Sequence, residues 1–179
     1  MSTRLVILGL LQDHPLYGYE IKSIIEDHMG DWTNIAFGSI YFALRKLSEE
    51  GFIEKVGTEQ TGNRPSRSTY KGTESGRSEF MRLLREVWQG FDQQFFPLDI
   101  GLFFMSALPF EEVLVYLRTR AAKLAAVVQH LDEHQEIEVS KEEVPPLANA
   151  IFDHSRLHIQ AEQAWTKDLL DKVERGFYP

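Results

Sequence analysis

The chain has 179 residues, is 43% hydrophobic and carries a formal net charge of −8 at pH 7, a composition that excludes disordered and fibrous proteins and suits one large or two small domains. It contains no cysteine, which excludes disulfides, thiolate catalysis and cysteine-based metal centres. It also has no apolar run near the roughly 20 residues of a membrane span and no recognisable secretory signal. We therefore expect a cytoplasmic protein with no membrane association and no cofactor.

The N-terminal part predicts three helices followed by a hairpin. Helix-like apolar spacing covers about residues 2–12 and 18–30, and a third helix is expected over about 37–50. Two segments that alternate in the manner of strands, 52–56 and 68–71, flank a loop with glycine and proline. Three helices and a hairpin in this order are typical of a winged helix-turn-helix.

The third predicted helix has two different faces. Its apolar face is formed by Ile40, Ala43, Leu44 and Leu47. The opposite face carries Tyr41, Phe42, Arg45 and Lys46, so we expect the first face to be buried and the second to be exposed. After the hairpin, Thr73 is a suitable N-cap for a fourth helix.

The second half predicts a helical hairpin. From Phe110, a heptad seam predicts a long helix that needs a partner, through Leu114, Leu117, Ala121, Leu124, Val128 and Leu131. The last helix is expected to present an apolar stripe at Leu147, Ile151, Ala161, Trp165 and Leu169. The apolar surface that remains on two such helices indicates pairing with another subunit.

Charge is distributed unevenly along the chain. Residues 38–72 hold six basic and four acidic side chains, a net +2, whereas residues 77–179 hold 11 basic and 17 acidic ones, a net −6. The acidity therefore lies mostly outside the third helix and the hairpin, the parts of a winged helix-turn-helix that are expected to face DNA. We predict a mainly α protein: an N-terminal winged helix-turn-helix with a two-stranded wing at 1–85, and a C-terminal antiparallel helical dimerisation domain, which could also bind an effector, at 86–179.

Several short motifs together resemble one known family. They are Leu8-Gly9-Leu10-Leu11, Gly18-Tyr19-Glu20-Ile21, Gly38-Ser39-Ile40-Tyr41 with Ala43-Leu44 and Leu47, Glu50-Gly51-Phe52-Ile53, Arg64-Pro65, Tyr70, and Thr73-Glu74-Ser75-Gly76-Arg77. The combination resembles the PadR family of bacterial transcriptional regulators, in the longer branch with a helical C-terminal dimerisation domain. Two positions depart from the family pattern: Phe42 stands where proline is frequent and Gly72 where an aliphatic residue is usual.

The resemblance implies a homodimeric repressor that binds operator DNA and releases it when a small effector, such as an aromatic acid, is bound. An activator of the same family and a winged-helix module that pairs with protein remain as alternatives. The chain has no nucleophile motif, phosphate loop or catalytic dyad, so we do not expect an enzyme, although a small helical enzyme acting on an aromatic acid is the rival of another class.

The candidate DNA contacts lie on three segments. They are Ser39, Tyr41, Arg45 and Lys46 on the third helix, Tyr17 and Tyr19 at the start of the second, and Arg64, Arg67 and Lys71 in the wing. A hydroxyl at a helix start can reach phosphate, and arginine can bond a guanine edge. The alternatives are that Ser39 only caps, that Tyr41 packs on the wing, that Tyr19 is core, and that the wing charges are merely solvated.

The candidate effector contacts are aromatic and histidine side chains: Phe91, Phe95, Phe96, His154, His158 and Trp165. His154 and His158 fall in the centre of the predicted stripe of the last helix, where a polar ring must find a partner. Alternatively these histidines and aromatics are ordinary core. His130 and His134 share the four-residue spacing of metal ligands, but we expect them to lie away from the seam, solvated, and predict no metal site.

Overall fold

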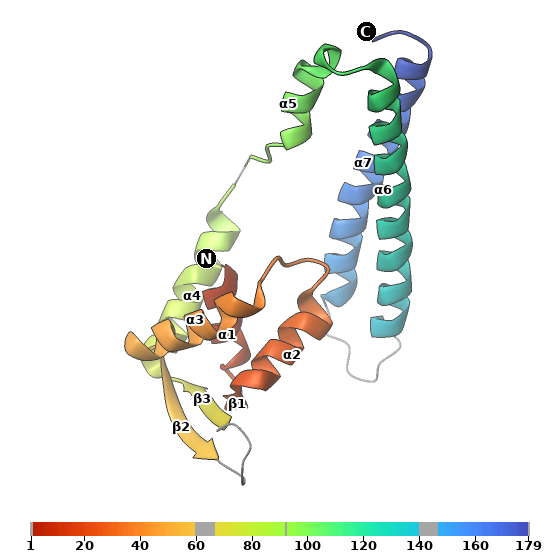
Figure 1. The fold of residues 1–179 in the computed structure, drawn as a ribbon. Coiled ribbons are helices and arrows are strands. Elements are labelled where there is room, and N and C mark those ends of the chain that lie inside the picture. The colour runs from red at the N-terminus through yellow and green to blue at the C-terminus, as the bar shows by residue number, and fades with distance from the viewer. Residues whose placement is uncertain (1, 60–66, 92, 140–146, 179) are drawn as a thin grey trace. The chain divides into compact units, whose positions relative to one another are not determined.

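The computed structural model describes residues 2–59, 67–91, 93–139 and 147–178 (Figure 1). It divides into two compact units, residues 1–92 and 93–179. The domain boundary predicted after residue 85 falls inside helix α4 (Glu74–Gln89), and the assignment of a separate role to each half stays a prediction. No helix in the described ranges is long and apolar enough to cross a membrane.

The first unit is a winged helix-turn-helix, as predicted. Its helices are α1 (Ser2–Leu10), α2 (Gly18–Met29), α3 (Phe37–Glu49) and α4, and its strands are β1 (Leu16–Tyr17), β2 (Ile53–Glu59) and β3 (Arg67–Gly72). β2 and β3 form the expected antiparallel wing. The short β1 adds a third strand that the sequence did not predict, giving the order β1-β3-β2.

The core of this unit confirms the predicted apolar face of α3. Ile40, Leu44 and Leu47 of α3 are at most 1% exposed, and they pack with side chains from α1, α2 and β2. Ile21 and Ile25 of α2 join the same cluster. Burying one face of α3 so completely fixes how its other face is presented to solvent.

Two of the family-like motifs meet at the junction of α3, the wing and α4. Gly51 has a φ of +77°, which lets the chain leave α3. Thr73 is the predicted N-cap: its Oγ1 accepts from the Gly76 backbone N–H at 3.1 Å and donates to the Gly51 carbonyl at 2.8 Å. Ser75 Oγ donates to the same carbonyl at 3.0 Å. The start of α4 is therefore tied to the end of α3.

The second unit contains α5 (Pro97–Phe103), a 3₁₀ turn (Met105–Ala107), α6 (Phe110–Val139) and α7 (Ala148–Glu174). Figure 1 shows α6 and α7 running side by side as the predicted helical hairpin. The α6 seam is confirmed, since Leu114, Leu117 and Leu131 are buried.

The prediction of which α7 surface packs on α6 is wrong. Leu147 is 68% exposed and Trp165 38% exposed, and of the predicted stripe only Leu169 is buried. The buried positions are Phe152, Thr166, Leu169 and Val173. Polar residues interrupt this buried seam and weaken its apolar pattern. The sequence pattern therefore favours the neighbouring stripe, which is more apolar.

Candidate nucleic-acid interface

The exposed face of α3 has the composition that the sequence predicted. Tyr41 is 42% exposed and Phe42 55% exposed, and the side chain of Arg45 is 65% exposed. These residues follow Ala36, whose extended backbone begins the helix. A well-packed helix therefore presents aromatic and cationic groups on one side.

Ser39 and Tyr41 each make local contacts. Ser39 Oγ donates to the Ala36 carbonyl at 2.6 Å, and the Ser39 backbone N–H donates to the same carbonyl at 2.9 Å. The Tyr41 ring lies 5.2 Å from the Phe37 ring, centroid to centroid. A Cβ at Gly18 would lie 3.6 Å from Tyr41, so this ring packs against the start of α2 while part of it stays in solvent.

The cations of α3 are close to one carboxylate. Lys46 Nζ donates to Glu49 Oε2 at 2.8 Å, and Arg45 Nε lies 3.8 Å from Glu49 Oε1. The hydrogen bond from Lys46, helped by the positive charges of Lys46 and Arg45, lowers the pKa of Glu49. Glu49 is therefore ionised at neutral pH and partly neutralises this surface.

The start of α2 adds two stacked tyrosines. The rings of Tyr17 and Tyr19 lie 5.5 Å apart with 19° between their planes. Tyr19 is 45% exposed, so the alternative that it is a core residue is wrong. The Tyr17 backbone N–H donates to Glu20 Oε2 at 2.7 Å, which secures the first turn of the helix.

Two aromatic residues of this surface were absent from the predicted set. Phe37, the first residue of α3, is 54% exposed, and Lys22 Nζ of α2 lies 4.8 Å from its ring centroid. Phe42 carries the guanidinium of Arg45 at 5.4 Å from its centroid. Phe42 was expected on the exposed face of this helix but was not assigned a contact. Phe37 had no such signal, because a single sequence does not show that a phenylalanine at a helix start is exposed.

The wing is described only in part. Lys71 is exposed on β3, in register with Glu54 of β2. Arg67 is the first residue of β3 and pairs in register with Glu59. Arg64 lies outside the described residues. A register shift between Lys55 and Gly57 adds one unpaired residue to β2.

The residues predicted to contact an effector are largely exposed in the single chain. Phe91 is 93%, Phe95 80% and Phe96 51% exposed. His154 and His158 are also exposed, with their rings 4.6 Å apart, and they are not in the α6 seam. The expectation that these histidines lie in a buried stripe is therefore wrong, as are the alternatives of core histidines and core phenylalanines.

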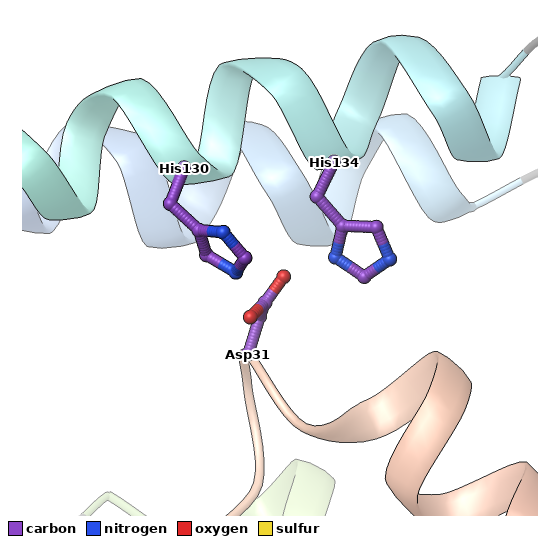
Figure 2. A group of neighbouring side chains, drawn as sticks. All are labelled: Asp31, His130 and His134. Atoms are coloured by element: carbon purple, nitrogen blue, oxygen red, sulfur yellow. The ribbon is translucent and has the colours of Figure 1, made fainter.

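His130 and His134 project from the same side of α6 (Figure 2). Their rings are 5.9 Å apart, and the His134 ring meets Phe152 of α7 edge-on at 5.6 Å. The expectation that both lie away from the seam is wrong for His134, whose side chain is only 21% exposed. His134 lies about one helical turn after His130, at a position of α6 where its ring contacts Phe152 of α7.

Comparison with known proteins finds a family match within the first unit. Residues 7–82 match the transcriptional regulator PadR-like family. The negative transcriptional regulator PadR of Bacillus subtilis (strain 168) is 38% identical over 73 residues, which are 41% of this chain and 40% of that relative. The sequence match thus spans less than half of the curated relative.

Similarity in fold covers more of the chain than the sequence match does. Bacillus subtilis PadR in complex with operator DNA has a TM-score of 0.79 at 22% identity, over 97% of this chain and 99% of that one. The same relative in complex with p-coumaric acid has a TM-score of 0.72 at 21% identity, with the same coverage. The Vibrio cholerae virulence activator AphA has a TM-score of 0.76 at 19% identity, over 97% and 99%. The sequence match to the PadR-like family is thus confined to residues 7–82, whereas the likeness in fold extends over both units.

Proposed function

We propose that this protein is a transcriptional regulator that binds specific sites on double-stranded DNA. The observation that carries the proposal is the exposed face of α3, where Tyr41, Arg45 and Lys46 stand on a helix whose opposite face is buried. A helix of this kind in a winged fold is suited to the major groove. The Bacillus subtilis relative, solved in complex with operator DNA, supports the same use of the fold.

The contacts divide into base-reading and phosphate-binding groups. Arg45 is proposed to bond a guanine edge, since its planar fork matches O6 and N7. Phosphate contacts are assigned to Ser39, Tyr41 and Lys46 on α3, to Tyr17 and Tyr19 at α2, and to Arg64, Arg67 and Lys71 in the wing. The wing would then add salt-dependent affinity more than sequence choice.

A homodimer is proposed because apolar side chains remain uncovered on the second unit. On α7, Leu147 and Leu157 are 68% and 66% exposed, and Trp165 is 38% exposed. Apolar side chains left uncovered on a long helix favour an interface with another subunit. A two-fold pair would present two copies of α3 to two half-sites, with a spacing set by the C-terminal helices.

Release by a small effector is the proposed regulation, with the protein acting as a cytoplasmic repressor. Phe91, Phe95, Phe96 and Trp165 would supply apolar contacts, and His154 and His158 polar ones, to an aromatic acid. The complex of Bacillus subtilis PadR with p-coumaric acid supports this class of ligand. An effector that binds more tightly to a dimer conformation whose α3 helices do not match the half-site spacing would release the operator. Activation remains the second candidate, favoured by the likeness to the activator AphA.

A mobility-shift titration on the DNA upstream of the protein's own gene tests the proposal. We expect a shift that weakens steeply between about 50 and about 200 mM salt. Arg45→Ala should weaken binding by about tenfold, whereas Arg85→Ala, which removes an exposed arginine from α4, should change it little. Absence of a salt-sensitive shift would refute DNA binding. Repeating the titration with p-coumaric acid, with wild type and His154→Ala, tests the effector.

A further inference from the structure

Glu49 is a carboxylate on the face of α3 proposed to meet DNA. It lies one turn from Arg45 and Lys46, and its side chain is 52% exposed. A free anion here would repel phosphate, which opposes binding to any DNA. The presence of Glu49 among the cations therefore requires a role other than increasing the affinity for DNA of any sequence.

Lys46 is the cation that Glu49 holds most closely. The 2.8 Å hydrogen bond from Lys46 Nζ engages one of the three donors of the ammonium group and offsets its charge. Lys46 must give up or share this partner before it can bind a phosphate. Since phosphate contacts carry no sequence information, weakening one of them lowers affinity for all DNA alike.

Arg45 is held differently, on two sides. The Arg45 Cζ lies 5.4 Å from the centroid of the Phe42 ring, and Glu49 Oε1 lies 3.8 Å from the Arg45 Nε. A cation over an aromatic face is attracted by the ring, and a carboxylate beside Nε restricts rotation of the guanidinium. The two terminal amino groups form a separate, end-on edge of the guanidinium, and this fork matches guanine O6 and N7.

Phe42 itself is 55% exposed, so burial in the core does not explain a phenylalanine here. Its neighbours on α3, Ala43 and Leu44, are buried and supply the packing. Among the described residues, the Phe42 ring lies against the guanidinium of Arg45.

We propose that Phe42 and Glu49 are specificity-determining residues, which hold Arg45 as a base-reading fork and withdraw Lys46 from general phosphate binding. Both act as positioning residues, through Arg45 and Lys46. The inference rests on the proposed DNA-binding function, and it adds that α3 gives up affinity for any DNA in exchange for discrimination between sequences.

The test compares binding to the upstream DNA with binding to unrelated DNA of the same length, across a salt series. Phe42→Leu should lower affinity for the upstream DNA by about five- to tenfold and leave unrelated DNA within about twofold, because the lost fork geometry affects only base contacts. Arg45→Lys keeps the charge without the fork and should show the same pattern. Adding Phe42→Leu to Arg45→Lys should cause no further loss, since the two changes remove one interaction.

Glu49→Gln should do the opposite to unrelated DNA. Freeing Lys46 should raise the affinity of the protein for unrelated DNA and steepen the logarithmic salt slope of this binding by about 1. Discrimination between the upstream DNA and unrelated DNA should therefore fall. Glu50→Gln is the matched control, because Glu50 pairs instead with Arg4 of α1 at 2.7 Å, and its slope should stay unchanged.

The outcomes separate the two proposals. Three results would overturn this inference alone. They are an equal loss of affinity for both DNAs in Phe42→Leu, additive losses in the double variant, and an unchanged salt slope in Glu49→Gln. A wild-type protein that binds no DNA in a salt-sensitive way overturns the DNA-binding function as well. Thermal unfolding midpoints within about 4 °C of wild type show that the single variants are folded.

Discussion

Gly76 shows how one residue positions the whole of α4. A Cβ at this position would lie 1.9 Å from the Phe52 carbonyl oxygen, closer than any two such atoms can come. The absent side chain lets the first turn of α4 approach the residue that follows α3 and Gly51. Gly72 has a milder constraint, since a Cβ there would meet the Leu11 carbonyl at 2.9 Å, which gives a reason for glycine where the family pattern has an aliphatic residue.

Gly76→Ala should therefore destabilise the first unit by about 3 kcal/mol, because a backbone oxygen cannot move aside as a flexible side chain can. Urea unfolding followed by circular dichroism measures the loss. Gly38→Ala is the control, since its Cβ would meet nothing within 4 Å. That variant should be neutral or up to about 1 kcal/mol more stable, through helix propensity. Equal stability of the two variants would contradict the packing argument.

Glu79 links α4 to α1 and makes stability depend on pH. The hydrogen bond from Arg82 is the main cause that lowers its pKa, and Arg4 lies 3.7 Å away. A carboxyl with a pKa lowered by folding stabilises the folded state above its ordinary pKa of 4.5, and this contribution is lost as pH falls through the lowered value.

Glu79→Gln should consequently lower the thermal midpoint at about pH 7, and this deficit should shrink towards about pH 3, as the wild-type carboxylate takes up its proton. Differential scanning calorimetry at the two pH values measures the change. Glu54→Gln on the exposed face of β2 should show little effect at either. A deficit for Glu79→Gln that is the same at both would exclude an ionic origin.

At the scale of elements, α6 and α7 are held by a seam that contains a buried hydroxyl. Thr166 is 0% exposed, and its Oγ1 has no hydrogen-bond partner among the described residues. It lies on the same face of α7 as Leu169 and Val173. A buried polar atom without a partner costs free energy that a methyl group of the same shape does not.

Thr166→Val should accordingly stabilise the second unit, by about 1 to 2 kcal/mol. The measurement is the urea midpoint of the intact chain. Thr119→Val makes the same chemical change at an exposed position of α6 and should shift the midpoint little. Destabilisation by Thr166→Val would mean that the hydroxyl has a partner in solution.

At the scale of the whole molecule, the proposed function requires two copies of the chain. The outer stripe of α7, defined by Leu147, Ile151, His154, His158, Ala161 and Trp165, is the surface predicted to be covered by the second copy. Placing histidines within this apolar stripe would bring ionisable groups to the subunit contact. Spacing of the DNA-reading helices would then depend on how these helices pair.

Trp165→Glu should convert the proposed dimer to a monomer, because a carboxylate buried between subunits lacks a partner. Light scattering coupled to size exclusion measures the mass, and the far-ultraviolet spectrum should stay helical. Gln160→Glu adds the same charge to an exposed position of α7 that belongs to neither stripe, and should remain dimeric. A dimeric Trp165→Glu variant would place the interface elsewhere.

Some of this architecture follows from short stretches of sequence. The buried face of α3, the cap at Thr73 and the wing depend on residue spacing and on cap and turn chemistry within a few positions. Such features form from neighbouring residues, so their signals survive in a single sequence. The charge asymmetry that pointed to residues 38–72 is likewise a property of the chain itself.

Other features were decided only by contacts between distant segments. The stripe of α7 that packs on α6, the pairing of β1 with β3, and the Phe42 ring beneath Arg45 were not predicted. An amphipathic helix with two apolar stripes does not specify which one is buried, because that depends on the shape and polarity of its partner. The sequence by itself determined a winged helix and a helical hairpin, whereas the tertiary structure decided which face of each remains exposed, since burial is a property of packed pairs and not of single segments.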